Sequence, residues 1–545
     1  MARTSSRRVG YGIMLVMAVF VASCGGPGGG DGGEAAVGGN VDADVGDAAG
    51  TTTMGEVDES EYDKDARFVW AARTMARSLN PHLTPFTGGS VPSLTMLHDR
   101  LTYTDPYTAE IQPMLATDWE VSEDGKAVIF SLRDDVTYHD GEKFDAASLV
   151  ANFDYGKAMG PAHPEAAGYE LIESAEVIDE FSVQYNLTAA AGGAIPSLMS
   201  GGLGIPVSPA SFDREDHKTY DGGTGPYMIK EVVPGQSHTM VPFPDYYDPD
   251  DQNIGELEVY LETNEDTTLN AIATGQVDAA ALAATVAQRA EASGLQVVSG
   301  LSNTAWIVGF NIELTEMTDP RVRQALNMAI DRQQISDGPL GGECVPTVQP
   351  WNENHPGHNP DYPGDYYTYD PAGARALLAE AGFPNGIEFE IDTYTIPDYV
   401  PVAEVIQAQL AEAGFTTTIR QLDTAQLSPG FRTEETLDTW FTRSPYGAPP
   451  VNTITNTWLP GSDSNPGEWT DEELIGLYSE LIAETDQEAQ NQILQDISAR
   501  IAEAPSHTLL LCHETSFLVG TDDVIGLEPA VAGYMDFRRM GKSAS

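Results

Sequence analysis

Alternating apolar and polar positions predict strands in LATDWEVSEDGKAVIFSLRDDVTYHDGEKFDAASLV, residues 115–150. Two alternating runs lie on either side of residues 123–125, Glu-Asp-Gly, which are typical of a hairpin turn, and Asp140-Gly141 indicates a second turn. A helix is expected to begin after Asp145, because its carboxylate can accept hydrogen bonds from the first turn. The run FSVQYNL, residues 181–187, places apolar side chains on one face and predicts a further strand.

Helical spacing is clearest in TDPRVRQALNMAIDRQQI, residues 318–335. Asp319 is a good N-cap, Pro320 suits the first helical position, and apolar residues follow at helical intervals from Val322 onward. The stretch YDPAGARALLAEAGF, residues 369–383, begins in the same way. Two helices are therefore expected to start at an Asp-Pro pair.

The hexapeptide LAEAGF occurs twice, at residues 378–383 and 410–415. In each copy a glycine, Gly382 or Gly414, can take the left-handed conformation that ends a helix. Each copy leads into an alternating run, IEFEIDTY in the first case and TTTIRQL in the second. Helices that alternate with strands in this way predict an α/β lobe.

The N-terminus carries an apolar run after basic residues. Arg7 and Arg8 precede the apolar residues 11–22, which are too short for a typical membrane span and predict a secretory signal. The Val-Ala-Ser before Cys24 resembles the lipobox of lipoprotein signals, which implies removal of residues 1–23 and a lipid on Cys24. The alternatives are an ordinary signal peptide with Cys24 as a spare thiol, or an uncleaved anchor.

Residues 24–65 are rich in Gly, Ala, Asp and Glu and hold almost no large apolar side chains. Such a segment cannot bury enough apolar surface to fold, so a flexible tether is expected. The remaining residues, about 480, are too many for one core, and at least two domains or lobes are predicted.

The chain carries 27 basic and 83 acidic residues, which gives a net charge of −56. This balance argues against nucleic acid as a partner, since phosphate binding depends on lysine and arginine. An acidic excess spread along the chain is typical of proteins that work in high salt, an interpretation that concerns solubility rather than fold.

Two further cysteines, Cys344 and Cys512, follow Cys24 in the chain. Outside the cytoplasm they can persist as a disulfide. Because their spacing does not show whether they meet, the alternative of two buried or free thiols stays open.

Four stretches together resemble one protein family: residues 115–150, GTGPYMI at 223–229, GFNIELTEMTDPRVRQALNMAIDR at 309–332, and YDPAGARALLAEAGFP at 369–384. They are similar, in this order, to the extracytoplasmic solute-binding proteins of ABC importers for dipeptides, oligopeptides and nickel, the family 5 solute-binding proteins. The likeness extends from about Arg67 to the end of the chain.

The resemblance implies an α/β fold of the periplasmic-binding-protein type, with two lobes, a hinge and a cleft. Lobe one would cover residues 66–308 with an inserted subdomain at about 100–215, lobe two residues 309–504, and the chain would return to lobe one at 505–545. Function would follow from closure of the lobes around a peptide-like solute, with delivery to the permease and ATPase of an importer. The resemblance also implies a monomer without a cofactor, held by its lipid at the outer face of the cytoplasmic membrane.

The main candidate for solute recognition lies in DTWFTRSPYGAPP, residues 438–450. In peptide-binding relatives an aspartate after the tryptophan pairs with the free amine of the peptide, whereas this chain has Arg443. A partly desolvated arginine suits a carboxylate or phosphate through its bidentate fork. The resemblance therefore implies a solute with an anionic group. The alternative is that Arg443 pairs with one of the chain's own acids.

Other cleft candidates are mostly aromatic. Tyr394 and Tyr399 occupy the loop that faces the cleft in relatives, and Trp440 and Tyr446 flank the arginine in sequence. Aromatic rings with polar tips can exclude water and still offer a hydrogen bond. Arg73 follows the first expected strand and is a further candidate. The alternative for the aromatic residues is a place in the core.

Metal binding and catalysis have weaker support. The stretch HPGHNPD holds His355, His358 and Asp361, but its Pro and Gly indicate a surface loop rather than a metal site. The chain has no G-x-S-x-G or H-E-x-x-H motif, so an enzyme is not expected. An extracellular hydrolase and a purely structural lipoprotein remain as alternatives.

Overall fold

The computed structural model describes residues 61–76, 78–86, 88–216, 219, 221–396, 398–447, 449–529 and 537–544. The expected signal peptide, the expected lipidation site Cys24 and the tether up to residue 60 lie outside the described residues. Near the start of the described chain, Tyr62 forms a β-bridge with Ser543. The first and last described segments therefore lie side by side.

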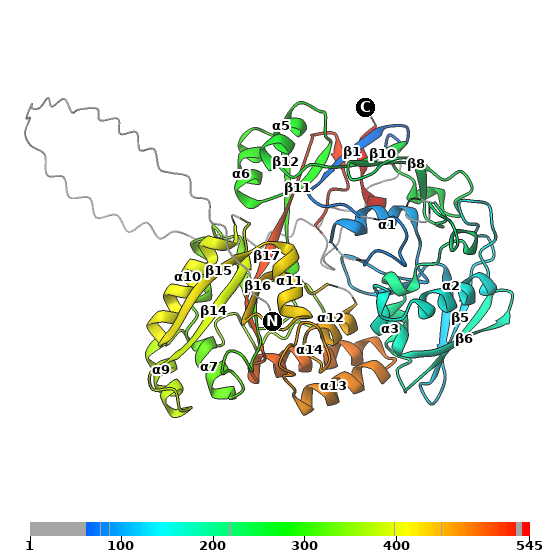
Figure 1. Cartoon of the computed structure of the whole chain (residues 1–545). Helices are drawn as coiled ribbons and strands as arrows, with labels where there is room; N and C mark the ends of the chain where they lie inside the picture. Colours follow the sequence, from blue (N-terminus) through cyan, green and yellow to red (C-terminus); the bar gives the residue numbers. More distant parts are fainter. Residues whose placement is uncertain are drawn as a thin grey trace, which may run out of the picture. The chain divides into compact units, whose positions relative to one another are not determined.

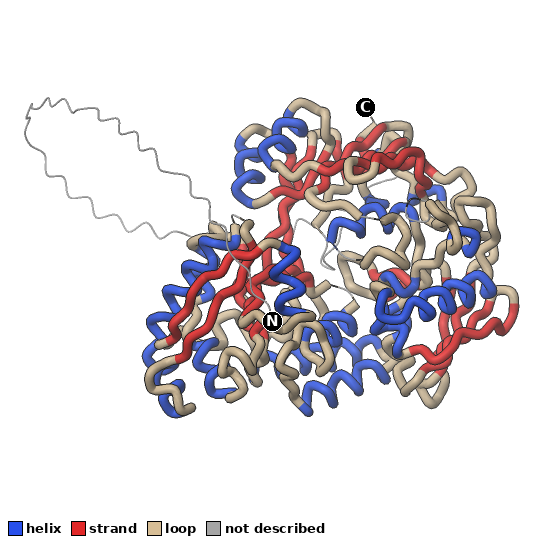
Figure 2. The backbone as a smooth tube through the Cα atoms, viewed as in Figure 1, coloured by secondary structure: helices blue, strands red, loops and turns tan. Residues whose placement is uncertain are grey.

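One sheet of eleven strands runs through the described residues, and Figure 2 colours its strands red, as it does those of the smaller sheets. The strand order is β15-β14-β16-β12-β17-β11-β1-β10-β9-β8, and β13 also pairs with β17. The strands are β1 (Arg67–Ala72), β8 (Tyr227–Val233), β9 (Ser237–Pro242), β10 (Glu256–Leu261), β11 (Ala279–Leu282), β12 (Gln296–Phe310), β13 (Cys344–Pro346), β14 (Ile387–Tyr394), β15 (Phe415–Leu422), β16 (Thr439–Pro445) and β17 (Thr508–Gly520).

The long strands β12 and β17 join the two halves of this sheet. They run antiparallel, and their register shifts between Leu301 and Ala305. On one side of this shift β17 pairs with β11, and on the other side β12 pairs with β16, where Trp306 lies opposite Arg443. An irregularity in the ladder lets strands bend, so the β12–β17 pair departs from a regular ladder at this shift.

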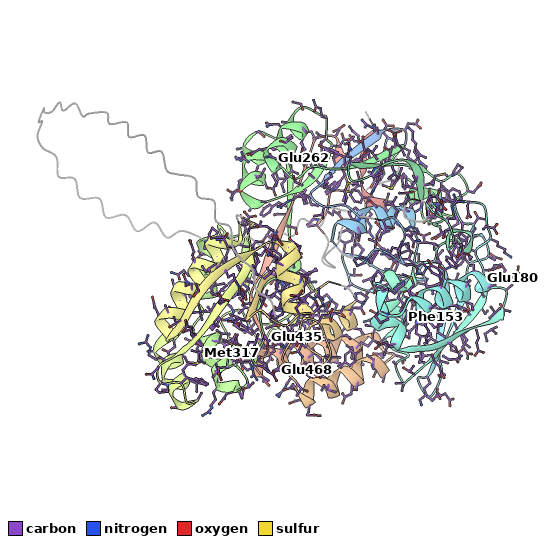
Figure 3. The ribbon with its side chains drawn as sticks, in the orientation of Figure 1. Phe153, Glu180, Glu262, Met317, Glu435 and Glu468 are labelled. Atoms are coloured by element: carbon purple, nitrogen blue, oxygen red, sulfur yellow. A yellow bond between two sulfur atoms is a disulfide. The ribbon has the colours of Figure 1, made fainter. Side chains whose placement is uncertain are left out.

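A separate antiparallel sheet lies within the segment expected for the subdomain. Its order is β4-β5-β7-β6, with β4 (Ala116–Val121), β5 (Ala127–Leu132), β6 (Ile172–Asp179) and β7 (Ser182–Leu187). Helix α2 (Ala146–Met159) packs on this sheet, and the ring of its Phe153 lies 5.9 Å from that of Tyr185 (Figure 3). Gly125 forms the turn between β4 and β5 at a φ of 68°, and Asp145 accepts a capping hydrogen bond from Ser148. The expected hairpin and helix start are confirmed.

Helices surround the half of the large sheet that contains β14, β15 and β16 (Figure 1). They are α7 (Pro320–Met328), α8 (Arg332–Asp337), α9 (Pro371–Glu380), α10 (Tyr399–Ala413), α11 (Thr424–Arg432), α12 (Pro450–Thr457), α13 (Glu472–Ala483) and α14 (Gln487–Glu503). Asp319 and Asp370 cap α7 and α9, and Gly382 and Gly414 have φ angles of 105° and 97°. Since β14 and β15 also run parallel, both predicted helix-to-strand units are confirmed.

The remaining described elements are short. The helices are α1 (Val91–Leu97), α3 (Ala166–Glu170), α4 (Ile195–Leu198), α5 (Glu265–Ala273) and α6 (Ala284–Ala292), and the strands are β2 (Thr102–Thr104), β3 (Ile111–Pro113), β18 (Val524–Ile525) and β19 (Gly541–Lys542). No helix in the described part of the chain combines the length and the apolar character needed to cross a bilayer.

A tight backbone contact joins the segment before α4 to the corner between α13 and α14. The backbone nitrogen of Ala194 donates to the carbonyl of Ile482 at 3.2 Å, and the Gln490 amide donates to the carbonyl of Gly193 at 3.0 Å. A Cβ at position 193 would lie 1.7 Å from the carbonyl oxygen of Glu484. Only glycine therefore fits at this position, and we call these interactions the Gly193 contact.

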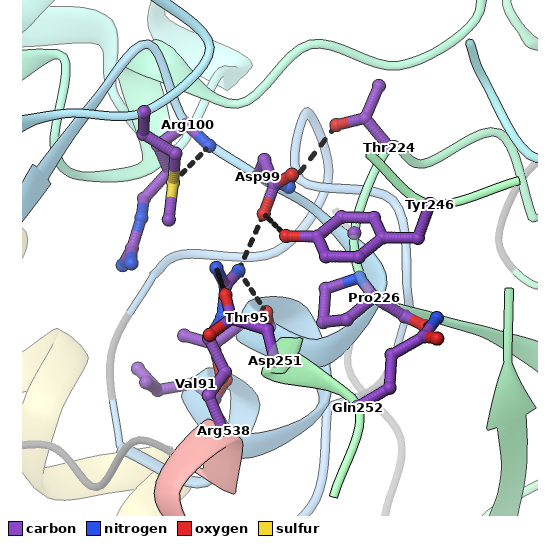
Figure 4. A network of polar contacts seen from close by, with 12 residues as sticks. Val91, Thr95, Asp99, Arg100, Thr224, Pro226, Tyr246, Asp251, Gln252 and Arg538 are labelled. Carbon is purple, nitrogen blue, oxygen red and sulfur yellow. Dashed lines mark hydrogen bonds and ion pairs between the residues drawn. The ribbon is translucent and has the colours of Figure 1, made fainter. Parts of the chain in front are cut away.

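A buried ion pair anchors the last described segment (Figure 4). Arg538 donates to the carboxylate of Asp99 at 2.6 Å and to the carbonyl of Thr95, in α1, at 3.0 Å. Tyr246 donates a further hydrogen bond to Asp99 at 3.4 Å, and Asp251 lies 3.4 Å from the guanidinium. Because a buried charge is tolerated only when it is paired and hydrogen-bonded, this network fixes the C-terminal segment beside α1.

The hydrogen bonds of two buried histidines, His82 and His163, fit the neutral form of each ring. The backbone nitrogen of Glu165 donates to Nδ1 of His163, so Nε2 of that ring carries the proton and donates to His82 at 2.9 Å. Nε2 of His82 in turn donates to Asn152 at 3.1 Å. A further proton on either ring would break one of these hydrogen bonds.

Lowering the pH should destabilise the fold before most carboxylates titrate. Burial lowers the pKa of six histidines from 6.5, to about 4 for His98, His163 and His238 and to about 3 for His355, His507 and His513. Because the folded pKa lies below the unfolded one, their contribution is complete above pH 6.5 and is lost as the pH falls toward 4. As the pH falls through this range, each of these histidines lowers the free energy of unfolding by up to about 1.4 kcal/mol per pH unit.

The midpoint of urea unfolding should therefore fall steadily between about pH 7 and about pH 5. Between about pH 7 and about pH 8 these six histidines should add no further slope. Burial lowers the pKa of His139, but the Asp221 carboxylate outweighs burial and the pKa is raised, so this histidine should lower the midpoint as the pH rises. A midpoint that stays constant from neutral to mildly acidic pH would contradict this expectation.

Candidate functional site

Three neighbouring strands bring side chains together on one face of the large sheet. Trp306 of β12 lies opposite Arg443 of β16 and, on its other side, opposite Cys512 of β17. Residues that lie opposite each other on paired strands share a face of the sheet. Side chains two residues apart on one strand also share a face, so Glu514 lies on the same face as Cys512. The face lies where β12 and β17 pass from one half of the sheet to the other.

Arg443 is held by an ion pair and two aromatic rings. Its Nη1 lies 2.9 Å from Oε1 of Glu514, and its Nε donates to the hydroxyl of Tyr399 at 3.3 Å. The guanidinium carbon lies 5.4 Å from the ring of Trp306 and 5.5 Å from that of Tyr399. Burial lowers the pKa of Arg443, but the Glu514 carboxylate and Tyr399 outweigh burial, and the pKa is raised. The arginine stays charged and pairs with an acid of the chain.

Both members of this ion pair still reach solvent. The side chains of Arg443 and Glu514 are 25% and 31% exposed. Within the described residues, Nη2 of the arginine and Oε2 of the glutamate have no hydrogen-bond partner. A guanidinium edge and a carboxylate oxygen are therefore available side by side.

One predicted tyrosine, Tyr399, contacts Arg443, and a second, Tyr394, packs against Tyr399. Tyr399 begins α10 and is buried, with its ring 4.9 Å from that of Trp306. Tyr394 ends β14, and its ring lies 5.2 Å from that of Tyr399. We call Arg443, Glu514, Trp306, Tyr394 and Tyr399 the Arg443 cluster.

Trp440 lies on the other face of β16, because it is an odd number of residues from Arg443 along the strand. Its indole nitrogen donates to the hydroxyl of Tyr394 at 3.2 Å, which links it to the edge of the Arg443 cluster. Arg432 stacks on the same tryptophan at 5.4 Å. Trp440 thus supports Tyr394 and does not face Arg443.

Tyr446 and Arg73 lie away from the Arg443 cluster. Tyr446 is 2% exposed, and its ring packs 5.3 Å from that of Trp458. Tyr446 is therefore a core residue, which was the alternative to a place in the cleft. Burial raises the pKa of its hydroxyl. Arg73 follows β1, and its guanidinium lies 2.6 Å from the carboxylate of Glu265. Arg73 and Arg443 therefore pair with different acids, Glu265 and Glu514.

Trp306 and Glu514 are members of the cluster that the sequence did not single out. Each sits in a stretch that reads as a strand, TAWIVGF and LCHETSF. Nothing in the spacing relates residue 514 to residue 443, because strand register is set by tertiary pairing. One weak sequence signal was available: Glu514 lies two residues after Cys512, so on a strand the two side chains point to the same face.

Cys344 and Cys512 form a disulfide, with their Cα atoms 5.5 Å apart, and both residues are buried. In the pairing of β13 with β17, Cys344 lies opposite Glu514. The disulfide therefore fastens β13 to β17 directly beside the acid that pairs with Arg443.

The histidine-rich loop is a packed structural element. His355 is buried, and its ring stacks 5.2 Å from that of Trp351. His358 bonds through Nδ1 to the carbonyl of Trp351 at 3.1 Å. The interpretation of this stretch as a surface loop is therefore wrong for His355. In the part of the chain that the structure describes, no group of three or more His, Cys, Asp or Glu side chains is placed to hold a metal ion.

Comparison with known proteins agrees with this architecture. The model of the bacterial extracellular solute-binding proteins, family 5, matches residues 110–466. The dipeptide-binding protein of Escherichia coli is 27% identical over 387 residues, which are 64% of this chain and 71% of that protein. The glutathione-binding protein GsiB of Salmonella paratyphi A is 26% identical over 328 residues, which are 58% of this chain and 62% of that protein.

Solved structures show the same fold. The periplasmic binding protein DppA of Helicobacter pylori, in complex with the peptide STSA, superposes with a TM-score of 0.75 at 20% identity. The match covers 89% of this chain and 99% of that one. The expected two-lobed fold is thereby confirmed.

Removing the disulfide should destabilise the protein strongly. The bond spans 168 residues of sequence, and closing a loop of that length restricts the unfolded chain enough to contribute about 3 to 5 kcal/mol. The double variant Cys344→Ser, Cys512→Ser should unfold at a clearly lower urea concentration than the oxidised parent. A midpoint equal to that of the parent would show that the bond does not stabilise the fold.

Proposed function

Because this chain belongs to the bacterial extracellular solute-binding proteins of family 5, we propose that it is the solute-binding component of an ABC importer. It captures a peptide or peptide-like solute that carries an anionic group. The observation that carries this proposal is the partly exposed guanidinium of Arg443, which lies against the rings of Trp306 and Tyr399 where β12 and β17 pass from one half of the sheet to the other. No chemical reaction is needed for this role.

Arg443 is suited to the anionic end of a solute. A guanidinium has five donors in a planar fork, and Glu514 and Tyr399 occupy only part of that fork. The aromatic walls restrict water, which strengthens a charged hydrogen bond to a carboxylate. A solute carboxylate could therefore bind at Nη2 without displacing Glu514.

Closure of the two lobes would complete the site. The register shift in the β12–β17 pair is the proposed hinge, and the Gly193 contact is the proposed point at which the lobes meet away from the hinge. In this proposal the protein works as a monomer outside the cytoplasm, tethered to the membrane by a lipid on Cys24. The closed form would then be recognised by the permease.

A nickel chelate or an opine-like solute is the second candidate. Both can carry carboxylates, which Arg443 would bind in the same way as a peptide carboxylate. The choice between these solutes depends on the rest of the cleft rather than on Arg443.

A thermal-shift screen tests the proposed function. The purified protein is heated in low and in molar salt with di- to pentapeptides, N-blocked peptides, opines and nickel chelates. A true solute should raise the melting temperature by mass action. Absence of a shift with every class would contradict the proposal.

Arg443→Ala should weaken binding of the solute found in this screen at least tenfold, or about 1.4 kcal/mol, because the solute carboxylate loses its charged partner. Titration calorimetry measures this loss. Arg289→Ala is the matched control, because Arg289, in α6, also forms an exposed ion pair, with Asp266. Unchanged affinity in Arg443→Ala would remove this arginine from the site.

Gly193→Ala should weaken solute binding about tenfold while leaving the Arg443 cluster intact, because the added Cβ would clash with the Glu484 carbonyl and oppose closure. Gly476→Ala, in α13, is the control, since a Cβ there meets nothing within 4 Å. Titration with one solute compares the two variants. Equal affinities would mean that the Gly193 contact plays no part in closure.

A further inference from the structure

The position of Glu514 suggests a second recognition group next to Arg443. Arg443 of β16 offers part of its guanidinium to solvent. The structure places an acid, Glu514 of β17, 2.9 Å from the same arginine. The cluster therefore contains both a cation and an anion at one point.

Glu514 is poorly explained as a purely stabilising residue. An ion pair whose members are 25% and 31% exposed is screened by solvent and contributes little to folding. Yet the residue is held firmly, since it lies opposite Cys344 and two residues after Cys512, the partners of the disulfide. A rigid carboxylate with one free oxygen at a partly exposed site is better suited to binding a ligand.

The spacing of the two free groups limits what they can bind together. Nη1 of Arg443 and Oε1 of Glu514 are in direct contact at 2.9 Å. The unoccupied Nη2 of the guanidinium and the unoccupied Oε2 of the carboxylate therefore lie on two groups that touch each other. They match a ligand whose carboxylate and ammonium are also adjoining, as they are on the α-carbon of a free amino acid. In an ordinary peptide the amine and the free carboxylate lie at opposite ends of the chain.

We infer that the Arg443–Glu514 pair binds a free α-amino-acid group, with the carboxylate on Arg443 and the ammonium on Glu514. The solute class is therefore an amino-acid conjugate or a peptide linked through a side chain, such as a γ-glutamyl peptide. This inference rests on the proposed function and narrows its solute class.

Two isomeric dipeptides test the inference without any mutation. γ-Glu-Ala carries the ammonium and a carboxylate on one carbon, whereas α-Glu-Ala has the same atoms and the same net charge but uses that carboxyl in its peptide bond. Titration calorimetry should show at least tenfold tighter binding of the γ isomer. Acetylation of its amine should remove most of this preference. Equal affinities for the two isomers would overturn the inference.

The variant Glu514→Gln tests whether the Glu514 carboxylate is the group that binds the ammonium of γ-Glu-Ala. The variant should lose at least tenfold in affinity for γ-Glu-Ala and change little for its N-acetyl form. Glu390→Gln is the matched control, because Glu390 also pairs with an arginine, Arg420, and is 41% exposed. An equal loss for the free and the acetylated ligand would mean that Glu514 only positions Arg443, and would overturn the inference.

The failure of this inference can be told apart from failure of the proposed function. If neither isomer binds but other solutes shift the melting temperature, the inference is wrong and the proposed function stands. If no solute of any class binds to protein that melts cooperatively, the proposed function is wrong as well.

Discussion

The antiparallel pairing of β12 with β17 is the interaction on which the rest of the structure depends. It makes one continuous sheet out of two halves, and its register decides that Trp306 lies between Arg443 and Cys512. A shift of one residue would turn every one of these side chains to the opposite face. The irregularity between Leu301 and Ala305 interrupts the same pair, so one element both builds the candidate site and contains the proposed hinge.

Paired charges have different roles in different parts of this acidic chain. Asp99 and Arg538 are almost fully buried, and their pairing compensates for lost hydration while it fixes the C-terminal segment. Arg443 and Glu514 are partly exposed, which leaves hydrogen-bonding capacity unused. The contrast follows from burial: a buried pair must be satisfied within the protein, whereas a pair at the surface of a cluster can exchange water for a solute.

Much of the local structure could be predicted because its causes lie within a few residues. An aspartate before Pro320 or Pro371 caps a helix through its own carboxylate, and Gly382 can adopt a left-handed conformation wherever the helix ends. The two tyrosines beside Arg443 were also identified, from family resemblance. Trp440 was placed beside the arginine on sequence proximity alone, but strand alternation turns it to the other face.

The sequence by itself determined the class of the chain, the caps and turns, and Arg443 as the cation of the candidate site. The class of the chain and the choice of Arg443 come from resemblance to the family, whereas the caps and turns depend on short-range hydrogen bonds. Only the tertiary structure decided that Glu514 pairs with Arg443, that Cys344 meets Cys512, and that position 193 lies against the Glu484 carbonyl. These contacts join residues far apart in the chain, and strand register and packing set them, which no local pattern encodes.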